Sequence, residues 1–118
     1  MAVIGFSDKA EHNWVVARWV YRQVLEDVIS HFPNDSEMVD MLTQKIETDG
    51  LLTEFVEHSL AARITNAIRE VTSGILSGNI RSGLQDKPSG TAHTINEYRK
   101  GLQRLLEAIP SPEELKTA

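Results

Sequence analysis

The sequence predicts an all-α protein, either a four-helix bundle or a helical array with a long central third helix. Two observations support this class. Apolar residues recur at steps of three and four in four segments, each bounded by residues that cap or break helices. No competing stretch shows the sustained alternation of apolar and polar residues that predicts a strand. The length suits one domain, so residues 1–118 are expected to form a single all-helical domain.

The central helix is predicted over residues 51–76, which contain no proline. At about 100° per residue, its apolar residues fall on one continuous arc of the helix. An apolar stripe of this length requires other helices to pack against it. The stripe consists of Leu52, Val56, Leu60, Ile64, Ala67, Ile68, Val71 and Ile75.

The first helix is predicted over residues 8–31, because Ser7 can cap it and Phe32 precedes a proline that ends it. Val15 and Trp19 project away from its main apolar face, so its N-terminal half is apolar on nearly all sides. This half is expected to be buried between neighbouring helices or covered by another chain. A closed monomeric bundle and a dimer both fit this pattern.

The second helix is predicted over residues 35–48, with Asn34 as its cap and Gly50 as the left-handed residue that closes it. The last helix is predicted over residues 95–108. Glycine, serine and proline interrupt the chain before and after that helix. The non-helical segments are therefore a long loop over residues 79–93 and a C-terminal tail over residues 110–118.

Composition narrows the classes of function. The chain has no cysteine, which excludes disulfides and thiolate metal sites and fits a cytoplasmic location. No stretch is long and apolar enough to span a membrane. The net charge is −5, and residues 35–58 hold seven acidic residues against Lys45 alone. Phosphate binding needs clustered basic residues, so a nucleic-acid partner is not expected, whereas a basic protein partner fits.

The motifs of common enzymes are missing from the sequence. There is no GxSxG, no Walker A and no GxGxxG motif, so we expect no enzymatic activity and no cofactor. Glu54, Glu57 and His58 are the exception, because carboxylates and an imidazole on one helix face can bind zinc or iron. A ferritin-like site would need a second such motif. A metal-binding or small-molecule-binding bundle with these three residues at its site is the alternative hypothesis.

The sequence favours a non-enzymatic module that binds another protein or itself. Trp19 and Val15 are candidate contact residues, since tryptophan is enriched at the energetic centres of interfaces and exposed apolar groups are unusual in monomers. We expect them to support a homodimer. The acidic segment supplies a second candidate surface, through which the protein would neutralise or regulate a basic partner. Its candidate residues are Asp35, Glu37, Asp40 and Glu47.

Overall fold

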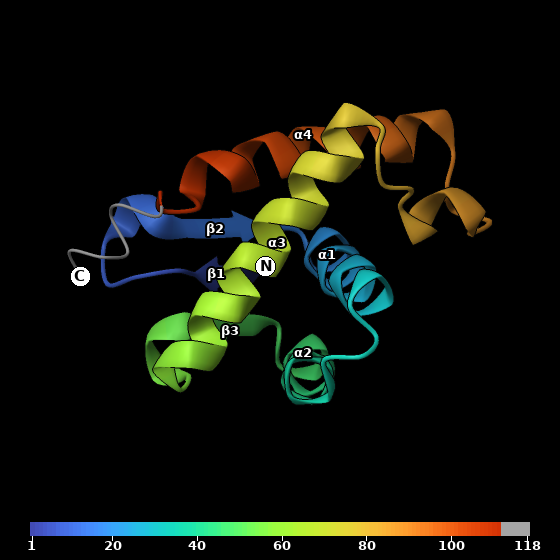
Figure 1. Ribbon diagram of the computed structural model, residues 1–118. Helices are drawn as coiled ribbons and strands as arrows, with labels where there is room; N and C mark the ends of the chain where they lie inside the picture. Colours follow the sequence, from blue (N-terminus) through green and yellow to red (C-terminus); the bar gives the residue numbers. More distant parts are fainter. Residues whose placement is uncertain (112–118) are drawn as a thin grey trace.

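A computed structural model describes residues 1–111 (Figure 1). Four α-helices, three short 3-10 helices and three strands follow one another along this part of the chain. In chain order they are β1 (Ala2–Gly5), η1 (Ala10–His12), β2 (Asn13–Val16), α1 (Arg18–His31), α2 (Ser36–Thr48), β3 (Gly50–Leu52), η2 (Thr53–Phe55), α3 (His58–Ser77), η3 (Gly83–Asp86) and α4 (Ala92–Ala108).

The three strands form one mixed sheet in the order β2-β1-β3. Strand β1 pairs with β2 in antiparallel fashion, with Ile4 opposite Trp14. It pairs with β3 in parallel, with Ile4 opposite Leu51. Successive side chains in a strand point to opposite faces of the sheet, so residues that pair across strands share a face. Ile4, Trp14 and Leu51 share the face that the helices cover, and all three are buried.

The all-α prediction is therefore wrong, and the molecule combines helices with a small mixed sheet. The predicted first helix fails over its N-terminal half, since residues 13–16 form a strand and the helix begins only at Arg18. In that strand Trp14 and Val16 are buried and Val15 is exposed, which explains the apolar groups on two sides. Four-residue strands are too short for their periodicity to be distinguished from that of a helix.

The predicted central helix also starts too early. Residues 50–52 form β3, and the helix α3 runs only over His58–Ser77. Leu52 belongs to the strand and is exposed, and Val56 precedes the helix. The rest of the predicted stripe is confirmed as core, because all its members from Leu60 to Ile75 are buried. The architecture is therefore not a bundle around a long third helix.

The connection between α2 and β3 departs from the prediction in a smaller way. Asp35, rather than Asn34, caps α2 by accepting a hydrogen bond from the Met38 N–H at 3.2 Å. Asp49 ends the helix in the left-handed region with φ 57°, whereas Gly50 already belongs to β3. The Arg18 guanidinium lies 2.8 Å from the Asp49 carboxylate, so an ion pair ties this unusual backbone position to α1.

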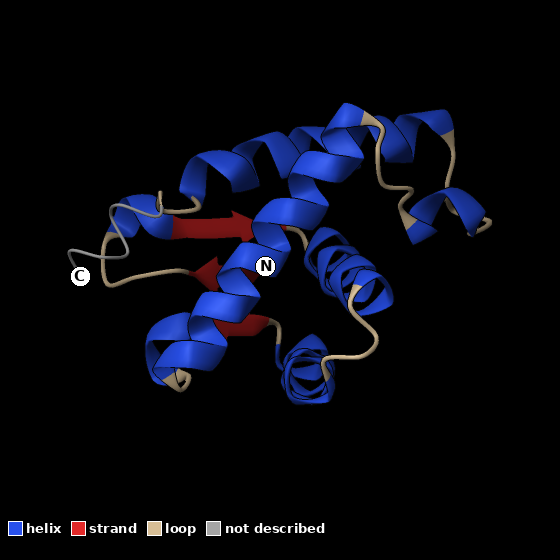
Figure 2. Cartoon of the chain, viewed as in Figure 1, coloured by secondary structure: helices blue, strands red, loops and turns tan. Residues whose placement is uncertain are grey.

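The helices cover one face of the sheet, and α3 crosses it (Figure 2). Helix α4 lies along β2, where the Trp14 indole N–H donates to the Gly101 carbonyl oxygen at 3.0 Å inside the core. Within residues 1–111, no helix is long and apolar enough to cross a membrane. The outer face of the sheet carries two exposed apolar residues, Val15 and Leu52.

Candidate functional site

The outer face of the sheet carries apolar side chains that the helices leave open. We call Val3, Val15 and Leu52 the open sheet face. Val3 lies directly opposite Val15 in the β1–β2 register, and Leu52 lies opposite Gly5 in the β1–β3 register. Val15 is 53% exposed and Leu52 39% exposed, while Val3 is half-buried. A sheet with apolar groups on both faces has a second face suited to contact with another molecule.

Gly5 allows the neighbouring side chains of Asn13 and Leu52 to pack close to the β1 backbone. A Cβ atom at Gly5 would stand 2.9 Å from both Asn13 Oδ1 and Leu52 Cδ2. Real Cβ atoms do not approach other heavy atoms so closely. Asn13 and Leu52 therefore close over the glycine backbone, and a side chain at this position would push Leu52 away from the sheet.

Trp19 lies at the start of α1, beside a groove against α4. The indole is 41% exposed and packs against Tyr98, with ring centroids 6.4 Å apart. Arg104 of α4 lines this groove and also lines the neighbouring groove that contains Val15. The structure thus places Trp19 and Val15 on different elements, each beside a groove that the exposed Arg104 also lines. Arg104 has no hydrogen-bond or ion-pair partner within residues 1–111.

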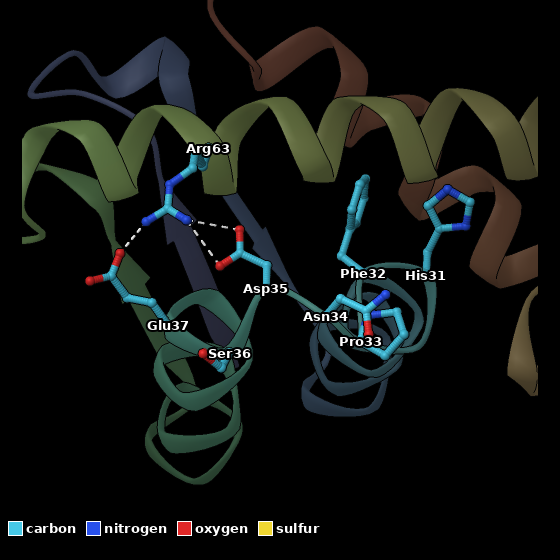
Figure 3. A pocket seen from close by; sticks show the side chains of 8 residues that line it. All are labelled: His31, Phe32, Pro33, Asn34, Asp35, Ser36, Glu37 and Arg63. Carbon is cyan, nitrogen blue, oxygen red and sulfur yellow. Dashed lines mark hydrogen bonds and ion pairs between the residues drawn. The ribbon is translucent and has the colours of Figure 1, made fainter.

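An arginine of α3 forms ion pairs with two of the four residues of the predicted acidic surface. Arg63 of α3 donates to both carboxylate oxygens of Asp35, at 2.9 Å each, and also bonds Glu37 (Figure 3). The single positive charge of Arg63 therefore offsets one of these two negative charges, and the Glu37 side chain is still 64% exposed. Asp40 and Glu47 are exposed on α2 and have no charged partner in the described part of the chain. These two are thus the predicted acidic residues that carry no internal ion pair within residues 1–111.

The candidate metal ligands do not converge on one point. Glu57 caps α3, and its carboxylate accepts hydrogen bonds from the Ser59 N–H, the Ser59 hydroxyl and the Leu60 N–H. These donors, led by the Ser59 backbone N–H, lower the pKa of Glu57 to about 2. Glu54 and His58 line a groove instead. Across residues 1–111, no group of three or more His, Asp or Glu side chains is arranged to hold a metal ion.

That groove lies between the end of β1 and the start of α3. Phe6, Ala61 and Ala62 give it an apolar lining, and Glu54 and His58 are exposed beside it. Phe55 follows Glu54 directly and is 79% exposed, but it does not line the groove. Sequence reasoning placed Glu54, Phe55 and His58 on one continuous helix over residues 51–76 and therefore did not foresee the groove.

One buried carboxylate was also missed. Asp27 on α1 is only 5% exposed, and its two oxygens accept four hydrogen bonds. The donors are the Gln23 amide at 3.0 Å, the Ser82 hydroxyl at 2.6 Å, the Gly83 N–H at 2.9 Å and the Tyr98 hydroxyl at 2.7 Å. We call this set the Asp27 cluster. It joins α1, the segment that contains η3, and α4.

The Asp27 cluster holds the predicted loop in place. Within residues 79–93 the chain forms η3, and α4 begins at Ala92, earlier than predicted. Burial, followed by the Asp27 charge, raises the pKa of Tyr98 well above its usual range. A sequence signal existed, since Asp27 lies three residues after Val24 and one before Val28 on the buried face of its helix. All four hydrogen bonds stay inside the fold, so the cluster serves structure.

The chain was also compared with known proteins. No protein-family model, no curated protein and no solved structure matches it.

Proposed function

We propose that the protein works by binding other proteins through the apolar surface that its own helices leave open. The observation that carries this proposal is the row formed by Val3, Val15 and Leu52 on the outer face of the sheet. Burial of such a row removes apolar area from water at about 25 cal/mol per Å². Aliphatic side chains at the centre of a contact, with charged groups at its rim, match the anatomy of protein interfaces.

Arg104 indicates the chemistry of the partner. This exposed residue lines both the groove beside Val15 and the groove beside Trp19, and it has no charged partner within residues 1–111. The partner should therefore present an apolar surface with a carboxylate near one edge, which would form a charge-assisted pair with the arginine. The homodimer expected through Trp19 and Val15 is one form of this function and stays a prediction.

A basic partner on α2 is the second candidate. Asp40 and Glu47 favour it, because both are exposed and unpaired in the described part of the chain. Because Arg63 pairs with both Asp35 and Glu37, the net negative charge of this surface is lower than the four acidic residues alone would give. The open sheet face is therefore the stronger candidate.

The test is co-purification from the cells that make the protein, with wild type and two matched double variants. Val15→Glu with Leu52→Glu places charge on the open sheet face, and Asp40→Lys with Glu47→Lys reverses the charge on α2. We expect a stoichiometric partner that the sheet-face variant loses and the α2 variant retains. Loss with the α2 variant alone would favour the basic partner. Retention of every partner by both variants would contradict the proposal.

A further inference from the structure

Phe55 is the most exposed aromatic side chain in residues 1–111, at 79%. It lies at the end of η2, which appears as the green turn before α3 in Figure 1. The backbone of this turn is fixed, because the Thr53 hydroxyl donates to the Gly5 carbonyl oxygen at 3.1 Å and the Val56 N–H donates to the Thr53 carbonyl oxygen at 3.1 Å. An aromatic ring on a fixed backbone loses little conformational entropy when it is buried by a partner.

The neighbouring groove has room for such a ring. It encloses about 350 Å³ between the end of β1 and α3. Its lining includes Ala61 and Ala62, whose methyl groups are too small to fill it, and Phe6, whose buried ring forms an apolar wall. The Phe55 ring of the same chain does not line this space, even though the adjacent Glu54 does. The molecule thus presents an aromatic anchor and an unfilled apolar groove side by side.

We infer that Phe55 enters this groove on a second copy of the chain, so that two copies exchange phenylalanines across a two-fold axis. In a two-fold interface the same patch serves both subunits, and each anchor meets the groove of the other. Adjacent anchor and groove satisfy that condition on a single surface. The inference rests on the proposed function, because it assigns one exposed apolar group to one partner, the protein itself.

The polar groups at the groove allow reciprocal contacts. Asp8, Glu54 and His58 line it, and Glu54 has no hydrogen-bond or ion-pair partner within residues 1–111. In a two-fold contact, the Glu54 carboxylate of one copy accepts a hydrogen bond from the His58 imidazole of the other, and this bond is formed twice. Reciprocal polar contacts at the rim of an interface fix its register. A second copy therefore matches the groove in its apolar groups and in these carboxylate–imidazole pairs.

The first test is sedimentation equilibrium of the full chain from low micromolar to millimolar concentration. We expect a reversible wild-type dimer, and a dissociation constant at least about 30-fold higher for Phe55→Ser, as for an interface hot spot. Glu70→Ser is the control, since Glu70 is an exposed residue of α3 outside every proposed contact surface and its replacement should leave this dimer intact. Circular dichroism verifies that both variants keep their helices.

The second test exchanges charges between chains. Glu54→Lys and His58→Glu should each weaken the dimer a few-fold, because the first removes the carboxylate that accepts from the imidazole and the second brings two carboxylates together. An equimolar mixture of the two variants should recover association, because the introduced lysine of one chain then faces the introduced glutamate of the other. Recovery only in the mixture requires contact between copies. Absence of recovery overturns the inference.

The two proposals fail separately. A wild-type monomer at every concentration, or a dimer that Phe55→Ser leaves intact, overturns the exchange of phenylalanines. Neither result touches the open sheet face, whose test is loss of a partner from the Val15→Glu, Leu52→Glu variant. Loss of that partner by Phe55→Ser as well would show one shared surface and would contradict the assignment of Phe55 to self-association alone.

Discussion

The Asp27 cluster and the open sheet face differ in how far their side chains are paired or buried within the molecule itself. At Asp27, a buried carboxylate receives four hydrogen bonds from three parts of the chain. On the sheet, Val15 and Leu52 are 53% and 39% exposed to solvent. The irregular segment around η3 is thus held in place by internal hydrogen bonds, whereas one face of the regular sheet keeps exposed apolar side chains. Lack of regular secondary structure and availability for binding are different properties here.

The largest expected effect is at the closed region. Asp27→Ala should lower the free energy of unfolding by about 3 kcal/mol or more, because it leaves the Ser82 hydroxyl, the Gly83 N–H and the Tyr98 hydroxyl without their acceptor. Urea denaturation measures this change. Glu26→Ala is the matched control, since Glu26 is exposed and pairs only with Lys87 at the surface. Equal midpoints for the two variants would show that the cluster does not stabilise the fold.

Substitutions at two glycines test how tightly the segment around η3 is packed compared with the edge of the sheet. A Cβ atom at Gly90 would stand 2.1 Å from the Leu84 carbonyl oxygen, so Gly90→Ala must displace backbone and should cost about 1–3 kcal/mol. At Gly50, in the edge strand β3, a Cβ atom would meet nothing closer than 3.9 Å. Gly50→Ala should therefore change stability by no more than about 0.5 kcal/mol. Thermal or urea melts that rank the two substitutions in the opposite order would contradict the packing described for the loop.

Alkaline pH tests the burial of the two tyrosines, one of which belongs to the Asp27 cluster. Both tyrosines have raised pKa values: burial, followed by the Asp49 charge, raises the pKa of Tyr21 to about 12, and burial, followed by the Asp27 charge, raises that of Tyr98 well above its usual range. Since the pKa is higher in the folded state, the stabilisation is complete below about pH 10, the unfolded value, and is lost as pH rises towards 12.

Ultraviolet absorbance of tyrosinate measures this titration. We expect no ionisation at pH 10 in the folded protein, and a sharp rise that coincides with loss of helical circular dichroism. Tyr21→Phe isolates Tyr98, whose ionisation should then occur only with unfolding. A gradual transition centred near pH 10 in that variant would mean that Tyr98 is not buried against Asp27.

The smallest effect is expected on the open sheet face. Val15→Lys should change the free energy of unfolding by no more than about 0.5 kcal/mol, since the side chain already faces water. Val16→Lys, one residue along the same strand, is the contrasting variant, because Val16 is only 3% exposed and its replacement buries a charge. Similar losses for both variants in urea denaturation would show that the outer face is covered.

Sequence reasoning succeeded where one periodicity extends over many residues. The stripe from Leu60 to Ile75 and the apolar face of α2 were readable because each spans several helical turns. It failed over the strands, each of three or four residues, whose side chains also fit helical spacing. The parallel pairing of β1 with β3 could not be predicted from local patterns, because it joins residues far apart in the chain, such as Ile4 and Leu51.

The candidate sites show the same limit. Val15 and Trp19 are exposed, but they belong to a strand and to a helix rather than to the single helix that was predicted, and their role in binding stays a prediction. The pairing of Asp35 and Glu37 with Arg63 depends on a contact between α2 and α3. Phe55 was overlooked, since a predicted helix gave it no special position. Local patterns identified side chains, and tertiary contacts decided their roles.

The position of β1 in the middle of the sheet affects how the chain folds as it is synthesised. This strand leaves the ribosome before its two neighbours, and β2 follows closely enough to pair with it as a hairpin. Its other edge stays unpaired until Gly50–Leu52 have emerged, after both α1 and α2. An unpaired strand edge invites pairing with other chains. The nascent protein is therefore most prone to aggregate during this interval, whose length is set by the synthesis of the residues that form α1 and α2.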